Sequence, residues 1–382
     1  MRIIVLGGDG YLGWPTAMHF AGRDHVVLVV DNYLRRRLAR ETNSEPLLPT
    51  LELQARCALF AALTGKPIEH RIFDCADREA LTRVFREFAP DTIIHYAEQP
   101  SAPYSMMGHD EALLTLKNNQ LTTFNMIWAV KEFAPGCNIV KLGTMGEYGT
   151  PDIDIEEGYI DINYKGRKGR FLYPRQGGSF YHMTKIFDTD MLAFHVRADG
   201  LAATDLMQGP VYGVSTDEAD LDPRLMPHFH YDDIFGTVVN RFITQAVAGI
   251  PLTVYGRGGQ VRGYIDIRDT LQCVELVALN PPQNKELRVY NQFTEIFSVL
   301  DLAERVKAVG DRLGLGVAIQ PVPNPRKESE EHYYRPAHEG LLRLGLKPHY
   351  LTDDRLAEMI EYILRHRGSI DATKIMPRVS WS

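Results

Sequence analysis

Two side chains four residues apart in "SFYHMTK", Tyr181 and Lys185, could together remove a proton from an alcohol. Residues at this spacing share one face of a helix, so the phenol and the ammonium can approach the same point. A nearby ammonium stabilises a phenolate and lowers the tyrosine pKa from its usual value of about 10. Thr144, after the apolar run "NIVKLG", would give the same oxygen a second hydrogen bond. This set predicts general-base catalysis on a hydroxyl group.

A glycine-rich turn near the start of the chain predicts a nucleotide cofactor that takes the hydride from such a reaction. "GGDGYLG" follows an apolar strand and opens a helix, so its backbone can approach a pyrophosphate. Asp31 ends the next apolar strand, 18 residues after Gly13, where a carboxylate can bind the hydroxyls of an adenine ribose. A carboxylate there repels a 2′-phosphate and favours NAD over NADP, while Arg35 and Arg36 point the other way. We expect the cofactor to contact Gly7, Gly10, Tyr11, Leu12, Gly13, Asp31, Asn32, Arg35, Asp74, Tyr181, Lys185 and Gln208.

These residues need a scaffold that brings the ends of several strands together. Short β-branched runs alternate with longer amphipathic segments through the first half of the chain. Such alternation predicts an α/β fold with a Rossmann-type doubly wound parallel sheet. The expected strands are 2–7, 25–31, 70–73, 92–97, 138–143 and 201–207, and the expected helices in this half are 77–88, 111–133 and 180–198.

After about residue 208 the prolines and longer loops become more frequent, which predicts a smaller C-terminal substrate-binding lobe. We expect residues 1–207 to form the NAD-binding domain, with an insertion at about 34–67, and residues 208–382 to form mainly the lobe. Part of 264–293 is expected to return to the first domain. A strand–helix unit is expected at 251–280, helices at 298–313 and 352–367, and a tail from Ser369 that packs along the surface.

The bulk composition limits the possible partners. A net charge of -7 argues against non-specific binding to nucleic acid or to an anionic membrane. The four cysteines form no CxxC pair and the 13 histidines show no ligand spacing, so we expect reduced thiols and no metal site. No apolar run approaches the ~20 residues of a membrane span, and no leader precedes the first strand, which together favour a cytoplasmic protein.

The glycine turn, the acidic strand end, Thr144 and the Tyr-x-x-x-Lys pair together resemble the extended, sugar-nucleotide branch of the short-chain dehydrogenase/reductase superfamily. Longer stretches are similar to the UDP-sulfoquinovose synthase family, among them "APYSM", "VKLGTMGEYGTPDIDIEEGYI", "YDDIFGTVVNRF" and "LTVYGRGGQVRGYIDIRDT". This resemblance implies a bound NAD⁺, the substrates UDP-glucose and sulfite, and a homodimer joined through the helices at 111–133 and 180–198.

The resemblance also implies a reaction, in which the sugar is oxidised at C4, the 6-hydroxyl leaves as water, sulfite adds at C6 and hydride returns to C4. In the commonest sugar-nucleotide dehydratases an Asp-Glu pair follows the catalytic hydroxyl as acid and base. Here Met145 and Gly146 follow Thr144, which leaves a smaller site without an anion that would repel sulfite. His182 then becomes the candidate for moving protons at C5 or C6, and Glu147 is a weaker one. The long loop before Tyr181 could form a sulfite pocket with Arg175.

Arginines of the second lobe are the expected ligands of a nucleoside diphosphate, because guanidinium groups bind phosphate in a bidentate manner. We expect the substrate to contact Gln99, Thr144, Glu147, Gln208, Arg241, Tyr255, Gln260, Arg262 and Arg326. Pro100 stands where the family motif has an arginine, a loss that would cost ~1.5–3 kcal/mol of binding or mark a different substrate. Two alternatives therefore stay open: an NDP-hexose 4-oxidising epimerase or dehydratase that adds no sulfite, and a non-catalytic dinucleotide-binding regulator.

Overall fold

The largest sheet of the protein carries the ends of strands on which the expected site depends. The structure is a computed structural model, and it describes residues 1–283, 285–325, 333–376 and 378–379. Within these residues the sheet has seven strands in the order β12-β8-β5-β4-β1-β2-β3, and all neighbours in it are parallel. Its strands are β1 Arg2–Leu6, β2 Val26–Asp31, β3 Ile68–Ile72, β4 Thr92–His95, β5 Asn138–Thr144, β8 Ala202–Gln208 and β12 Arg288–Gln292. The predicted doubly wound parallel sheet is confirmed, and β12 is a strand that the sequence analysis did not predict.

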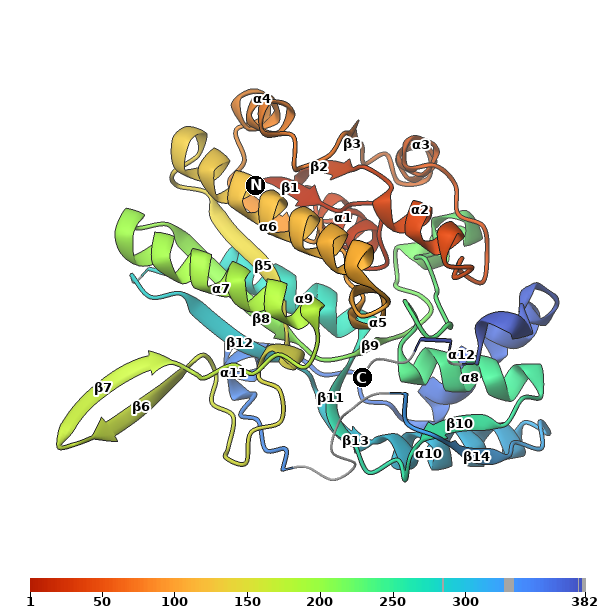
Figure 1. The fold of residues 1–382 in the computed structure, drawn as a ribbon. Coiled ribbons are helices and arrows are strands. Elements are labelled where there is room, and N and C mark those ends of the chain that lie inside the picture. The colour runs from red at the N-terminus through yellow and green to blue at the C-terminus, as the bar shows by residue number, and fades with distance from the viewer. Residues whose placement is uncertain (284, 326–332, 377, 380–382) are drawn as a thin grey trace.

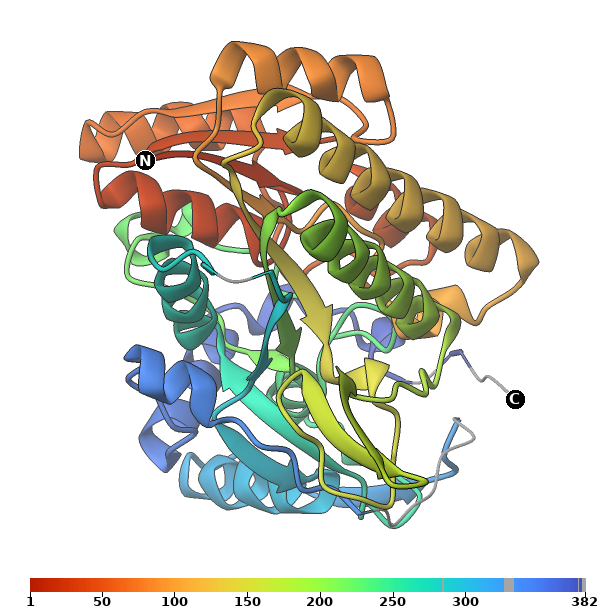
Figure 2. The same ribbon diagram turned by 90° about the vertical axis from the view of Figure 1, so that its left-hand side faces the viewer.

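Helices cover both faces of this sheet (Figure 1, Figure 2). Successive strand residues point to opposite faces, so Ile3 and Val5 pack with α1 and α9, whereas Ile4 and Leu6 pack with α4, α6 and α7. Burial on both faces explains why the strands are continuously apolar. The helices are α1 Gly13–Gly22, α4 Arg78–Phe88, α5 Ala102–Ser105, α6 His109–Phe133, α7 Phe180–Asp199 and α9 Ile267–Leu279. The long helices α6 and α7 lie side by side on one face (Figure 1).

The C-terminal lobe has its own apolar core, formed by three mutually packed helices and two small sheets. Its elements are β9 Val211–Tyr212, α8 Val238–Ala248, β10 Leu252–Tyr255, β11 Val261–Asp266, β13 Glu295–Ser298, α10 Val299–Arg312, β14 Ile319–Val322 and α12 Asp353–Arg365. The shorter helix α11 Glu339–Leu344 packs against β12. The expectation that the tail from Ser369 only packs along the surface is wrong, because Ile375 is fully buried in the core of the lobe.

Two segments lie outside the central sheet and the helices that cover it. The helices α2 Leu34–Glu41 and α3 Leu53–Thr64 lie between β2 and β3, where an insertion was expected. The other segment is a hairpin of β6 Tyr159–Tyr164 and β7 Arg167–Leu172, which projects away from the body (Figure 1). The sequence analysis expected a loop here and was wrong over these residues. The positive φ angles of Lys165 and Gly166 match a two-residue type I′ turn, the turn that joins tight hairpins.

Two further properties bear on the expectations from composition. All four cysteines are buried and unpaired. Among the described residues, no helix combines the length and the apolar character that crossing a membrane requires.

Candidate active site

The glycines of the first turn are required by the space around them. Gly7 has a φ of +82°, and a Cβ built on it would lie 2.6 Å from the carbonyl carbon of Tyr96. A Cβ on Gly13 would lie 2.0 Å from the carbonyl oxygen of Gly7, because helix α1 starts directly against the turn. Gly10 differs, since its Cβ would meet nothing closer than 3.5 Å. The turn therefore brings the first backbone N–H groups of α1 to the carboxyl edge of the sheet, where a phosphate can bind.

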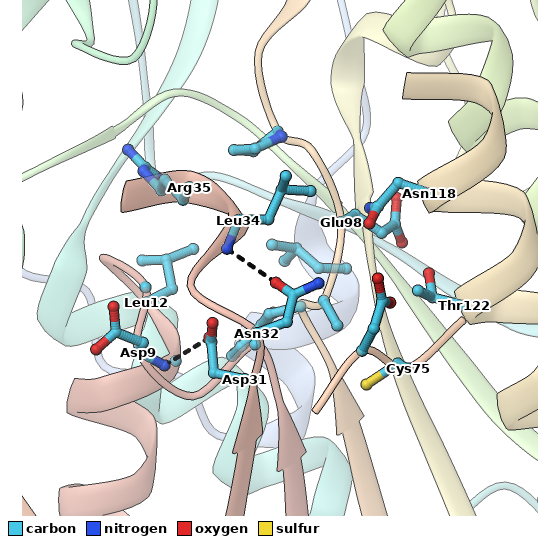
Figure 3. Close-up of a pocket in the computed structure, with 18 of the residues that line it drawn as sticks. Asp9, Leu12, Asp31, Asn32, Leu34, Arg35, Cys75, Glu98, Asn118 and Thr122 are labelled. Atoms are coloured by element: carbon cyan, nitrogen blue, oxygen red, sulfur yellow. Dashed lines mark hydrogen bonds between the residues drawn. The ribbon is translucent and has the colours of Figure 1, made fainter. Parts of the chain in front are cut away.

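A cavity of about 740 Å³, including its open mouth, lies over this turn (Figure 3). Of the residues expected to contact a cofactor, it is lined by Gly7, Gly10, Tyr11, Leu12, Gly13, Asp31, Asn32, Arg35 and Asp74. Tyr181, Lys185 and Gln208 are not part of its lining, whereas Glu98 and Pro100 are, although the sequence analysis assigned no cofactor contact to either.

Asp31 is held at the end of β2 by two backbone N–H groups. Asp9 N donates to its Oδ2 at 2.9 Å (Figure 3), and Tyr33 N donates to its Oδ1 at 2.7 Å. Burial, and then the nearby Asp9 carboxylate, raise the pKa of Asp31 to about 6. The carboxylate is thus positioned to accept hydrogen bonds from a ligand whose hydroxyl groups would favour its ionised form.

The two arginines that follow β2 have different surroundings. Arg35 lies in the cavity wall with its guanidinium over the ring of Phe235, 5.1 Å from the centroid, and burial lowers its pKa to about 10. Arg36 instead makes a bidentate pair with Asp9, with N–O distances of 2.7 and 2.8 Å. Arg56 of α3, which is fully buried, also pairs with the Asp9 carboxylate. The insertion is therefore fastened to the glycine turn through Asp9, which no sequence pattern indicated.

Tyr181 and Lys185 lie in the first two turns of α7, whose start is capped by Ser179 through a hydrogen bond from His182 N. Tyr181 N donates to Ser105 Oγ at 3.0 Å, which fixes this turn against α5. Lys185 Nζ donates to the carbonyl of Leu142 at 2.6 Å and lies 5.9 Å from the centroid of the Tyr181 ring. The ammonium is therefore anchored to β5, close to the phenol.

Thr144 is the last residue of β5 and caps the short turn Met145–Glu147, with its Oγ1 accepting a hydrogen bond from Gly146 N at 3.2 Å. A Cβ at Gly146 would lie 2.3 Å from Nε2 and 2.5 Å from Cδ2 of His182. The His182 ring is also 5.4 Å from the Tyr181 ring, centroid to centroid. The structure thus brings Thr144, Tyr181, His182 and Lys185 together between β5 and α7.

Glu147 and Arg175 face inward. Glu147 is fully buried, with Oε1 3.4 Å from Lys141 Nζ and Oε2 3.4 Å from Arg175 Nε. Arg175 reaches Asp190 with its other nitrogen, at 3.3 Å. Burial raises the pKa of Glu147, against the opposing effect of Lys141. Both side chains are thus used in an ion-pair network with Lys141 and Asp205 beneath the catalytic turn.

The residues expected to bind substrate fall into separate groups. Arg241 stacks on Tyr255 at 4.6 Å and donates to its hydroxyl at 2.8 Å, and Gln260 Nε2 donates to the Tyr255 carbonyl at 3.4 Å. Arg262 is half-buried in the adjoining strand β11.

The remaining expected substrate ligands come from other elements of the chain. Gln208, at the end of β8, donates to Gln292 Oε1 at 3.0 Å. The buried amide of Gln99 donates to Ser101 O and Thr115 Oγ1. Arg326 lies outside the described residues.

Comparisons with known proteins agree with this architecture. Residues 3–291 match the NAD dependent epimerase/dehydratase family. The chain is 50% identical over 380 residues to the chloroplastic UDP-sulfoquinovose synthase of Spinacia oleracea, covering 100% of this chain and 79% of the relative. It is 43% identical over 384 residues to the UDP-sulfoquinovose synthase of Sulfolobus acidocaldarius, covering 100% of this chain and 98% of the relative. A solved UDP-glucose 4-epimerase from Bifidobacterium longum, in complex with NAD⁺ and UDP, has the same fold, with a TM-score of 0.71, 20% identity and coverage of 96% of this chain and 99% of that chain.

Proposed function

Because the chain belongs to the NAD-dependent epimerase/dehydratase family and, within it, to the UDP-sulfoquinovose synthases, we propose that it converts UDP-glucose and sulfite into UDP-sulfoquinovose. The observation that carries this proposal is the contact between His182 and Gly146. A dehydratase that uses an Asp-Glu pair needs a side chain at position 146, and here an imidazole occupies that space. The site therefore has a proton carrier without the carboxylate that would repel sulfite.

NAD is the cofactor of this family, and the residues of this chain fit it. Gly7 and Gly13 let the turn close against neighbouring backbone, Gly10 places no side chain in the cavity where a pyrophosphate would lie, and Asp31 presents its carboxylate to the same cavity. We assign the pyrophosphate to the turn at Gly7–Gly13 and the adenine ribose to Asp31, with Asn32, Arg35 and Asp74 in the surrounding wall. Held there, NAD would supply the acceptor and later the donor of the hydride at C4 of the sugar.

The side chains at β5 and α7 move the protons. Tyr181 accepts the proton of the C4 hydroxyl, while Lys185 stabilises its phenolate and Thr144 donates a hydrogen bond to the sugar oxygen. His182 then takes the proton from C5, which the C4 carbonyl has made acidic, and passes it to the C6 hydroxyl. That hydroxyl leaves as water, and the C5–C6 double bond forms.

In the second half of the reaction the sulfur lone pair of hydrogen sulfite forms the C6–S bond as the C5–C6 double bond is broken, and the proton of the hydrogen sulfite passes through His182 to C5. Tyr181 finally gives its proton back to the C4 oxygen as the carbonyl is reduced. The net change is UDP-glucose plus sulfite to UDP-sulfoquinovose plus water, with no net oxidation of the cofactor.

For substrate binding we assign the nucleoside diphosphate to Arg241, Tyr255, Gln260 and Arg262. Arg241 donates from Nη1 to the Tyr255 hydroxyl and from Nη2 to the Thr253 carbonyl, and its buried Nε, which has no hydrogen-bond partner among the described residues, is the donor that remains for a phosphate. Pro100 lines the cofactor cavity and provides no charge, so the arginines of the lobe carry the anionic substrate.

We further propose a homodimer formed through α6 and α7. Their outer surfaces expose apolar side chains to solvent, with exposed fractions of 40–55% for Phe187, Phe124, Leu121 and Phe194. These side chains lie on two adjacent helices and would be buried by a second copy packed on the same face. Size-exclusion chromatography with light scattering should give twice the chain mass, and Phe194→Glu should shift the protein to the monomer.

A cytoplasmic location is supported by the unpaired state of all four cysteines, which suits a reducing compartment. The Spinacia relative is named as chloroplastic, so import into an organelle is the alternative in a plant host. Localisation of the full chain fused to a fluorescent protein in its own cells would separate the two.

The activity test is mass spectrometry of the purified protein incubated with UDP-glucose, with and without sulfite. We expect a sulfite-dependent mass for UDP-sulfoquinovose that disappears in Tyr181→Phe. A product that forms without sulfite, such as an epimer, or deuterium entering C5 with no sulfonated sugar, would instead assign a 4-oxidising epimerase or dehydratase.

A further inference from the structure

A carboxylate that this reaction scheme does not use lies against the catalytic lysine. Glu98 follows β4 in the wall of the cofactor cavity (Figure 3). Its Oε2 is 2.7 Å from Lys185 Nζ, and its Oε1 is 3.4 Å from His95 Nε2. The side chain is 2% exposed, so this pair is shielded from bulk water. An ion pair with this burial interacts far more strongly than one at the surface.

The contacts of Lys185 leave Glu98 as its immediate counter-charge. The ammonium is bound by the Leu142 carbonyl at 2.6 Å and by the Glu98 carboxylate, and it approaches the Tyr181 ring from the side of β4 and β5. Several titratable or charged groups face Tyr181 and Lys185. Glu98 and His95 come from β4 and its loop, and Lys141 and Glu147 come from β5 and the turn after it. His182 and Asp188 come from α7, and Asp205 comes from β8. Glu98 is the member of this set that forms an ion pair with Lys185.

The charge of Glu98 acts against phenolate formation. Burial alone would raise the pKa of Glu98, but Lys185, His95 and Lys141 lower it below the usual value, so the carboxylate is ionised. Burial raises the pKa of Tyr181 most, and Glu98 is the next contribution in the same direction. The cation that lowers the pKa of Tyr181 is Lys141, so Glu98 and Lys141 have opposite effects on this phenol.

We propose that Glu98 is a positioning residue that holds the ammonium of Lys185 and, as its counter-charge, sets the pH range over which Tyr181 ionises. This inference rests on the proposed roles of Tyr181 and Lys185. Tyr181 must accept a proton during oxidation at C4 and return it during reduction, which works best when its pKa is close to the working pH.

The test removes the negative charge of Glu98 and keeps the size and shape of its side chain. In Glu98→Gln, the amide oxygen can still accept from Lys185, but the carboxylate charge is lost. We expect the acid limb of C4 oxidation, followed as nicotinamide reduction by UDP-glucose without sulfite, to move to lower pH by about one unit. Glu98→Asp retains the charge at a longer distance from the ammonium and should shift the limb in the same direction by less. An unchanged acid limb in both folded variants would overturn the proposal.

Asp266→Asn is the matched control, because Asp266 is also a fully buried carboxylate in an ion pair, with Arg268 at 3.0 Å and Arg355 at 2.9 Å. It should lower the Tm without moving the acid limb. Titration of the ultraviolet phenolate band, as the difference between each protein and its Tyr181→Phe counterpart, measures ionisation without substrate. If the proposed activity were absent, this band would still shift to lower pH in Glu98→Gln when the Glu98 proposal is right.

Discussion

The imidazole of His182 lies where a side chain at Gly146 would have to be. A Cβ at position 146 would be 2.3 Å from Nε2, a distance at which one of the two groups must move. The centroid of the His182 ring is also 5.4 Å from that of the Tyr181 ring, and a Cβ on Gly177 would be 3.0 Å from the Cβ of His182. Glycine at 146 and histidine at 182 are thus one structural unit, and the departure from an Asp-Glu pair is a condition for this position of the imidazole.

We therefore expect Gly146→Ala to separate the two halves of the reaction. The methyl group displaces His182 while Tyr181, Lys185 and Thr144 keep their anchors, so C4 oxidation should fall by no more than about threefold. Exchange of the C5 hydrogen and formation of the sulfonated product should fall by about 10²-fold, the effect of an ~1 Å misplacement of a catalytic group. Nicotinamide absorbance measures the first step, and deuterium incorporation from D₂O measures the second.

Gly136→Ala is the control for this variant, because a Cβ there meets no atom within 4 Å. It should resemble the parent protein in both assays. Equal losses of oxidation and exchange in Gly146→Ala would show that the methyl group disturbs the whole site, and would contradict the assignment of His182.

Two glycines of the turn should affect different properties, Gly13 the stability of the fold and Gly10 the binding of the cofactor. Gly13→Ala places a Cβ 2.0 Å from the Gly7 carbonyl oxygen, so the start of α1 must shift, at a cost of about 1–3 kcal/mol in the free energy of unfolding. Gly10→Ala meets nothing closer than 3.5 Å and faces the cavity. We expect Gly10→Ala to keep its Tm in the nucleotide-free state but to bind NADH at least about tenfold more weakly, as a methyl group then holds the pyrophosphate away from the backbone. Thermal unfolding and NADH fluorescence measure the two effects, and a large loss of Tm in Gly10→Ala would contradict this account.

The parts of the site that could be predicted from the sequence are those whose geometry depends on local spacing. The turn at Gly7–Gly13, Asp31 at the end of β2, and the pair Tyr181 and Lys185 on one helix all have partners within one strand–helix unit. Strand and helix periodicity located the sheet in the same way. The hairpin at 159–172 also has a local signal, since the alternating residues of "YIDINY" are followed by a Lys-Gly turn. The sequence analysis did not use this signal.

The rest depends on contacts between distant segments, for which one sequence gives no spacing rule. Glu98 and Lys185 meet only because β4 and α7 are brought together by the sheet, and Glu147 meets Arg175 across the base of the hairpin. His182 could be proposed as a proton carrier from its place beside Tyr181, but its fit against Gly146 needed coordinates.

Asp9 gives a prediction about stability, because its carboxylate is shared by two arginines of the insertion. Arg56 is 0% and Arg36 11% exposed at the side chain, so removing the charge of Asp9 leaves two poorly hydrated cations without their partner. We expect Asp9→Asn to lower the free energy of unfolding by about 3–5 kcal/mol. Chemical denaturation of the nucleotide-free protein measures it. Lys66→Gln, which removes the partner of the exposed Asp24, should change stability by less than about 1 kcal/mol, and a similarly small effect in Asp9→Asn would show that the insertion does not depend on this cluster.

Asp31 predicts a pH dependence of cofactor binding. In the free protein its pKa is about 6, raised chiefly by burial and then by Asp9. The folded protein therefore binds this proton more tightly than the unfolded chain, so the contribution of Asp31 to stability falls as the pH rises from about 4 to about 6. Hydroxyl groups of a bound ribose donate to the carboxylate and favour its ionised form, so NAD binding must release the proton wherever the free carboxyl is protonated. Affinity should thus be constant above pH ~7 and should weaken below pH ~6, by at most tenfold per pH unit.

NADH fluorescence titrations of the nucleotide-free protein at several pH values, together with calorimetry in two buffers of different ionisation enthalpy, measure the affinity and the proton released. In Asp31→Asn the affinity should be lower at neutral pH and nearly independent of pH, because the amide neither ionises nor accepts as strongly. Arg36→Gln serves as the control for charge near the turn, since Arg36 pairs with Asp9 and makes no contact with Asp31 among the hydrogen bonds of the described residues. If the pH dependence survived in Asp31→Asn, another group of the cavity would carry the proton, and Asp74, which also lines the cavity, would be the next carboxylate to replace.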